Sequence, residues 1–253
     1  DARLSGPLAS RIKRALRLVV PEGTYTYTSA LVALNIAFYL AMLMRAHGGP
    51  SLDAFSKGIS LPVLIRFGGI VPEALAQGQI WRLVTPVFLH GGLLHVLFNC
   101  LWLVSLGPLI EHHYGRGRFI VLYVASGVAG FALSAAGHWG SPVVSVGSSG
   151  SIFGLMAAAV VAGYVRRIPG SDELRGGNLV KWIVLACVLS FLPRVDYFAH
   201  LGGGVAGALL TFFYAPRTQV RRLPDRLWLL LEVLTVGVVI AAFAFAWAAG
   251  PRL

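Results

Sequence analysis

Seven continuously apolar stretches, separated by shorter polar segments, dominate the pattern of this chain. They cover residues 28–45, 93–110, 118–137, 149–165, 178–193, 197–214 and 227–248. Each stretch approaches the length of about 20 residues that a helix needs to cross a bilayer. Because apolar and polar positions do not alternate within them, the strands of a membrane β-barrel are not expected. The pattern therefore predicts an all-α, polytopic membrane bundle of seven helices.

Composition and charge support this interpretation. The chain is 57% hydrophobic and 12% charged, whereas soluble domains carry about 25% charged residues. A net charge of +11 would by itself be compatible with nucleic-acid binding. However, fifteen of the 21 Lys and Arg residues lie in the alternate segments 1–27, 116–118, 166–181 and 217–226. This positive-inside distribution predicts a cytoplasmic N-terminus, an outside C-terminus and contact with anionic lipid, without a nucleic-acid partner.

The same pattern predicts three parts of the chain. Residues 1–27 form a cytoplasmic basic segment, residues 28–215 a six-helix core, and residues 216–253 a linker with a seventh helix. The first apolar stretch is long and follows basic residues, so we expect it to remain as an anchor and not to be cleaved as a signal peptide. The outside segment 46–91 is too long for a simple connector, and its apolar content predicts a structured loop.

Ser149 is the first candidate for chemistry, because it begins an apolar stretch within Gly147-Ser148-Ser149-Gly150. Polar groups inside a membrane are costly and are usually functional. The helix from Ser149 to Tyr164 would span about 24 Å, which is shorter than the ~30 Å hydrocarbon core. If Arg166 and Arg167 mark the cytoplasmic edge, Ser149 lies below the outer surface in a cavity that admits water.

His200 is the second candidate, and it lies on a different predicted helix. Gly203 and Gly207 share its helix face, and Gly150 has a similar partner four residues later. Small residues at this spacing allow membrane helices to pack closely. We therefore expect the two helices to meet, so that His200 can act as the base for a Ser149 nucleophile. Phe153, four residues after Ser149, is expected on the same face, packed on the imidazole.

His95 and Asn99 form a third candidate group, four residues apart on one helix face. Both side chains can donate hydrogen bonds, which suits an oxyanion hole. His90 precedes this helix and is expected to brace the loop. A metal bound by His90, His95 and His200 is a weaker alternative, because a carboxylate or cysteine ligand is missing from the set. We predict neither a metal nor another cofactor.

No acidic residue obviously completes a catalytic triad. Asp196 lies four residues before His200, but it is better placed to cap the sixth helix. The sequence therefore favours a Ser–His dyad. Glu111, at the cytoplasmic end of the second stretch, is expected to bridge to Arg116 or Arg118.

These motifs together resemble those of the rhomboid intramembrane serine proteases, over nearly all of residues 75–210. The resemblance rests on Gln79-Ile80-Trp81-Arg82, on His90 to Asn99, on Gly147 to Gly150, and on Ala199-His200 with Gly203 and Gly207. It implies that Ser149 is the nucleophile and His200 the base. It also implies that His95 and Asn99, with the Ser149 amide, form the oxyanion hole. Gly147 and Phe153 complete the predicted oxyanion and substrate-binding group, although Phe153 stands where the family often has tyrosine.

The resemblance implies a serine endopeptidase that cuts transmembrane proteins in or near the outer half of the bilayer. It implies an integral multi-pass protein, in the cytoplasmic membrane if the source is bacterial. One alternative is a catalytically silent relative that binds membrane proteins. A transporter or channel is a second alternative, but it would place polar residues along a continuous path, and here they gather at the outer half of the predicted bundle.

Overall fold

The computed structural model describes residues 26–49, 51–167, 172–192, 195–213 and 225–250. Predictions for the basic segment before residue 26 and for the linker 216–224 lie outside the described residues. Within the described part, the chain is a helical bundle, and β-pairing is limited to one isolated bridge between Ile70 and Ser145. The predicted all-α fold class is confirmed.

Each of the seven apolar stretches forms a helix. Among the described residues, four helices are long and apolar enough to cross a membrane: α2 (Thr26–His47), α6 (Leu93–Tyr114), α7 (Arg116–Gly137) and α11 (Asp225–Ala249). Three are shorter: α8 (Ser149–Val160), α9 (Gly177–Leu189) and α10 (Tyr197–Phe213). A π-helical turn, Val161–Val165, extends α8 at its C-terminal end.

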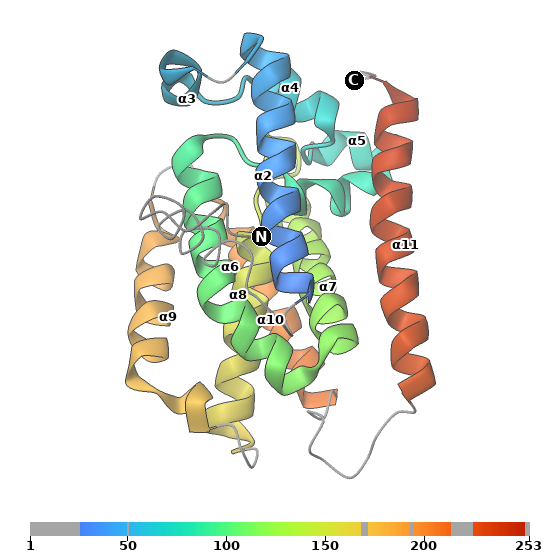
Figure 1. The fold of residues 1–253 in the computed structure, drawn as a ribbon. Coiled ribbons are helices and arrows are strands. Elements are labelled where there is room, and N and C mark those ends of the chain that lie inside the picture. Colours follow the sequence, from blue (N-terminus) through green and yellow to red (C-terminus); the bar gives the residue numbers. More distant parts are fainter. Residues whose placement is uncertain (1–25, 50, 168–171, 193–194, 214–224, 251–253) are drawn as a thin grey trace, which may run out of the picture.

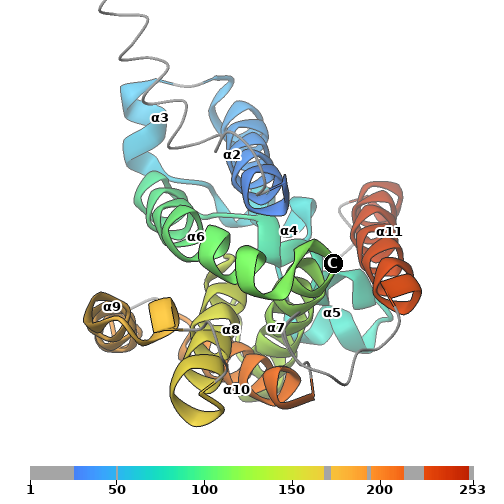
Figure 2. The same ribbon diagram turned by 60° about the horizontal axis from the view of Figure 1, so that its bottom comes forward.

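Helix α7 is the centre of the bundle, and α9 and α11 lie on opposite sides of it (Figures 1 and 2). In the apolar part of α7, 67% of the residues are buried inside the protein, whereas in the apolar part of α11 only 11% are buried. Helix α7 packs against α8 and α10, which carry Ser149 and His200. The exposed apolar side chains of α9 and α11 suit contact with lipid.

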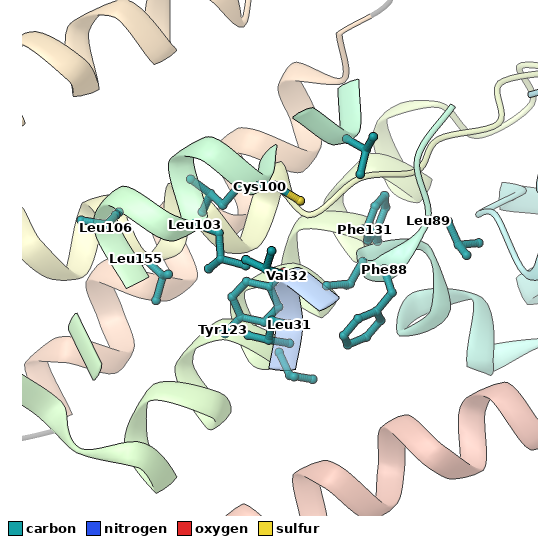
Figure 3. Packing of buried hydrophobic residues seen from close by; sticks show 14 of the residues in the cluster. Leu31, Val32, Phe88, Leu89, Cys100, Leu103, Leu106, Tyr123, Phe131 and Leu155 are labelled. Atoms are coloured by element: carbon teal, nitrogen blue, oxygen red, sulfur yellow. The ribbon is translucent and has the colours of Figure 1, made fainter. Parts of the chain in front are cut away.

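One hydrophobic core joins the helices around α7. Figure 3 shows buried side chains of α2, α6, α7 and α8, together with Phe88 and Leu89 from the loop before α6. Tyr123 and Phe131 of α7 are almost fully buried within it. This packing holds the loop against the helices that carry the candidate site.

The segment between α2 and α6 is structured, as its apolar content predicted. It contains five short helices: α3 (Leu52–Lys57), α4 (Leu61–Phe67), α5 (Pro72–Ala76), η1 (Ile80–Leu83) and η2 (Thr85–Phe88). They cover one end of the bundle (Figure 1). Helix α11 reaches them through Phe243, whose ring stacks on Phe38 of α2 at 4.2 Å and meets the edge of Phe88 at 5.8 Å.

Glu111 binds the start of α2, a partner that the sequence did not predict, and of the two arginines expected beside it, Arg116 lies 3.7 Å from Glu232. The buried carboxylate of Glu111 accepts hydrogen bonds from the backbone N–H groups of Tyr27 and Thr28, each at 3.0 Å, and from the Thr28 hydroxyl at 2.8 Å. The first N–H groups of a helix have no partner within the helix, so a carboxylate placed there satisfies them. A residue of α6 thereby caps the start of α2.

Candidate active site

Ser149 is the first residue of α8, and irregular backbone precedes it. Gly147 has φ of +133°, a conformation that residues with side chains rarely adopt. The N–H of Gly147 donates to the Pro86 carbonyl at 2.9 Å, and Ser145 pairs with Ile70. The backbone before Ser149 is therefore held by the preceding loop, and it presents a half-buried serine at a helix N-terminus, where negative charge is stabilised.

The side chains of Ser149 and His200 meet. Ser149 Oγ lies 2.8 Å from His200 Nε2, which is hydrogen-bonding distance. The ring of Phe153 stacks on the imidazole, with centroids 4.3 Å apart and planes 13° from parallel. Both features agree with the positions expected from the sequence, and the stacked ring restricts how the imidazole can turn.

Glycines make this meeting possible. A Cβ atom on Gly203 would lie 2.9 Å from the Cα of Gly150, and one on Gly207 would lie 2.6 Å from the carbonyl carbon of Gly154. Real Cβ atoms do not come this close to backbone, so only glycine permits the observed contact between α8 and α10. The two glycine faces pack together, as their spacing predicted.

His95 and Asn99 lie on the face of α6 that points toward this pair. A Cβ on Gly147 would lie 2.6 Å from His95 Nε2 and 3.7 Å from Ser149 Oγ, so the histidine ring occupies the space beside the serine. Asn99 Nδ2 donates one hydrogen to the His95 carbonyl at 2.9 Å. Because an amide NH₂ carries two hydrogens, a second N–H of Asn99 remains available to a ligand.

Ser148, next to the candidate nucleophile, is fully buried and turned toward α6. Its Oγ donates to Asn99 Oδ1 at 3.1 Å, and it lies 3.5 Å from His90 Nε2. This bond orients the Asn99 amide, because the oxygen is held on the Ser148 side. Burial lowers the pKa of His90, in the loop before α6, well below its usual value, and the neighbouring His95 lowers it further. His90 is fully buried in this loop, and its role as a brace stays a prediction.

Arg82 fixes the loop that carries the Trp81-Arg82 motif. The guanidinium is buried and donates to the carbonyls of Ile65 and Gly69, at 2.9 and 2.7 Å, and to Gln79 Oε1 at 2.7 Å. Burial lowers the pKa of Arg82 from its usual value, while three acceptors stabilise the charge. Arg82 therefore joins η1 to the last turn of α4 and to Gly69, which follows that helix.

Among the hydrogen bonds of the described residues, none joins the Asp196 carboxylate to the His200 ring. One of its oxygens accepts from the Ala199 N–H at 3.0 Å, and the other accepts from the Ser134 hydroxyl. The cap predicted from the sequence is present. His200 Nδ1 instead lies 2.7 Å from Ser190 Oγ, at the end of α9. Sequence reasoning missed Ser190, and its one signal was a serine at the end of an apolar stretch. Among the residues that the structure describes, no three His, Cys, Asp or Glu side chains gather in a metal-binding group.

A family model described as the Rhomboid domain matches residues 77–217. The rhomboid protease GluP of Bacillus subtilis (strain 168) is 34% identical over 192 residues, which cover 75% of this chain and 35% of that protein. RHOMBOID-like protein 5 of Arabidopsis thaliana is 36% identical over 179 residues, covering 70% of this chain and 58% of the relative. The putative rhomboid protease YdcA of Bacillus subtilis (strain 168) is 33% identical over 204 residues, covering 78% and 92%. The chain thus spans about a third of the first relative and somewhat over half of the second.

Proposed function

Since the chain belongs to the rhomboid family and is an integral multi-pass membrane protein, we propose that it is an active intramembrane serine endopeptidase. The observation that carries this proposal is the 2.8 Å contact between Ser149 Oγ and His200 Nε2. A serine hydroxyl is a weak nucleophile until a neighbouring base removes its proton. A half-buried serine beside a histidine is arranged for that step.

In the proposed reaction, Ser149 Oγ attacks the carbonyl carbon of the scissile peptide bond while His200 Nε2 takes the hydroxyl proton. The carbon–nitrogen bond then breaks, and His200 returns that proton to the leaving amine. The remaining acyl-enzyme ester is hydrolysed by water, which His200 activates in the same way. The stacked Phe153 ring keeps the imidazole in place between these two steps.

The negative oxygen of the tetrahedral intermediate needs donors that are already in position. We assign this role to the Ser149 backbone N–H, to His95 and to the second N–H of Asn99. The helix start places the backbone amide beside the serine. His95 supports the assignment by filling the space next to Gly147, and Ser148 supports it by orienting the Asn99 amide.

Rhomboid proteases act on transmembrane substrates within a lipid membrane. For this chain we propose cleavage in or near the outer half of the bilayer, with a cytoplasmic N-terminus and an outside C-terminus. The basic residues after α8 and before α11 support this orientation, because such residues favour the cytoplasmic side. Ser149, the first residue of α8, then lies at the end of the helix away from the cytoplasmic side. Because the helix is short, we expect this end to lie below the outer surface of the membrane.

The alternative is a silent relative that binds membrane proteins without cutting them. Labelling by a serine-directed fluorophosphonate separates the two, because it requires an activated serine and no knowledge of the substrate. We expect the protein in detergent or liposomes to label, and Ser149→Ala and His200→Ala to label not at all. Ser151→Ala is the matched control, since Ser151 lies on the same helix and is buried with no hydrogen-bond partner for its hydroxyl.

A cleavage assay on a model transmembrane substrate should give the same ranking of variants. Full labelling and full cleavage by Ser149→Ala would refute the assignment of the nucleophile. A wild-type protein that folds but neither labels nor cleaves would favour the silent alternative.

A further inference from the structure

Ser190 is buried, whereas nearby residues in the sequence are exposed. It directly follows α9, which lies at the periphery of the bundle (Figure 2). Val188 and Phe191 are 62% and 84% exposed, as expected for side chains in contact with lipid, whereas Ser190 is 7% exposed. Its side chain therefore turns inward, and the group that it meets there is the imidazole of His200.

The two hydrogen bonds of the Ser190 hydroxyl indicate whether Ser190 or His200 donates the hydrogen between them. Ser190 Oγ lies 2.9 Å from the Ala186 carbonyl, which can only accept, and 2.7 Å from His200 Nδ1. If the hydroxyl hydrogen goes to Ala186, the oxygen must accept from an Nδ1–H of His200. The Nε2 atom then carries a free lone pair, which faces Ser149 Oγ at 2.8 Å.

The reversed arrangement makes fewer hydrogen bonds. If Ser190 donated to Nδ1, the neutral ring would carry its hydrogen on Nε2 and donate to Ser149 Oγ. The Ala186 carbonyl would lose the Ser190 hydroxyl and keep only the Ser190 backbone N–H, at 3.0 Å, and the Ser149 hydrogen would need an acceptor outside the hydrogen bonds of the described residues. The first arrangement makes more hydrogen bonds and leaves no hydroxyl hydrogen unpaired, so it is favoured.

We infer that Ser190 is a positioning residue for His200, which holds the imidazole in the Nδ1–H tautomer so that Nε2 can accept the Ser149 proton. The inference rests on the proposed function for its catalytic part. Only the Nδ1–H tautomer can serve as the base, because the opposite tautomer has no lone pair toward Ser149. When His200 takes the Ser149 proton on Nε2 and becomes cationic, the hydrogen on Nδ1 stays in place and its bond to Ser190 is kept.

Ser190 thus occupies the place that an acidic residue holds in many serine proteases. Asp196 does not occupy it in this structure, because its two oxygens accept from Ala199 and Ser134 while Nδ1 of His200 faces Ser190. A hydroxyl suits this position in a membrane, because a neutral group avoids the cost of burying an unpaired carboxylate.

The test combines kinetics with nitrogen NMR on the full chain. In wild-type protein labelled with ¹⁵N-histidine, the His200 signals, assigned by their loss in His200→Ala, should show hydrogen on Nδ1 and none on Nε2. Ser190→Ala should give a mixture of tautomers. Its kcat for a transmembrane model substrate should fall roughly 5- to 30-fold, equivalent to about 1 to 2 kcal/mol, with KM unchanged.

Two variants control for a merely structural effect. Ser190→Thr keeps the hydroxyl and should restore both the tautomer and most of kcat. Ser105→Ala removes a similar bond, from a serine to the Leu101 carbonyl at 2.8 Å on α6, and should change neither. Hydrogen on Nε2 in the wild type, or an unchanged tautomer and kcat in Ser190→Ala, would overturn the inference. If the wild type cuts no substrate, the proposed function fails, while the spectra still decide whether Ser190 sets the tautomer.

Discussion

Replacing Gly203 by alanine should separate the two residues of the proposed dyad. The added Cβ would lie 2.9 Å from the Cα of Gly150 and closer still to its carbonyl oxygen. Carbon atoms in contact normally lie about 3.5–4.0 Å apart, so α8 and α10 must move apart by about 1 Å. Gly150 directly follows Ser149, and Gly203 is three residues after His200 on the same face. The 2.8 Å contact between serine and histidine would therefore be lost.

Two effects follow from this separation. Overpacking of this kind costs about 1–3 kcal/mol of stability. A misplacement of about 1 Å in a catalytic group can reduce the rate by about 100-fold. We therefore expect the rate of substrate cleavage and the rate of fluorophosphonate labelling by Gly203→Ala to fall together by about two orders of magnitude, with a lower melting temperature in detergent.

Gly204 provides the matched control. A Cβ on Gly204 would meet only the Phe153 carbonyl oxygen, at an ordinary 4.0 Å. Alanine favours a helix over glycine by up to about 1 kcal/mol, so Gly204→Ala should keep full activity and be no less stable. Equal activity and stability of Gly203→Ala and Gly204→Ala would refute the argument that glycine contact sets the distance between the proposed dyad residues.

Four further changes test other parts of the structure. The double variant His95→Ala with Asn99→Ala should lower turnover by on the order of 100-fold or more while leaving the fold intact, measured by cleavage kinetics, and a folded double variant at wild-type rate would remove them from the oxyanion hole. Glu111→Ala leaves the start of α2 uncapped and should lower the free energy of unfolding by roughly 1–3 kcal/mol; an unchanged melting temperature would contradict this. Deleting residues 217–253 should leave probe labelling detectable at reduced stability, because α11 is peripheral, and a well-folded truncation without labelling would show that α11 shapes the site. A model substrate span with glycine near its outer end and a small residue before the scissile bond should be cut faster than a poly-leucine span, since the segment must unwind to reach Ser149; equal cutting, mapped by mass spectrometry, would refute this.

The sequence alone determined the features that depend on local pattern. In a membrane every backbone group must be satisfied within the chain, so continuously apolar stretches can only be helices, and all seven were predicted. Asp196 was predicted as a cap because capping involves residues a few positions apart. The meeting of the helices that carry Ser149 and His200 followed from the spacing of four glycines, which is also a property of individual helix faces.

The tertiary structure decided the contacts that join distant parts of the chain. Glu111 caps α2 from 83 residues away, a contact that the sequence did not predict, because the first turn of α2 brings unpaired N–H groups to it. Ser190 meets the His200 ring only because the end of α9 turns this one side chain inward. Ser148 orients Asn99 because the start of α8 packs against α6. A hydroxyl or carboxylate can form hydrogen bonds with many different groups, so periodicity and spacing in the sequence do not specify its partner. The packing of the helices determines which partner lies within reach.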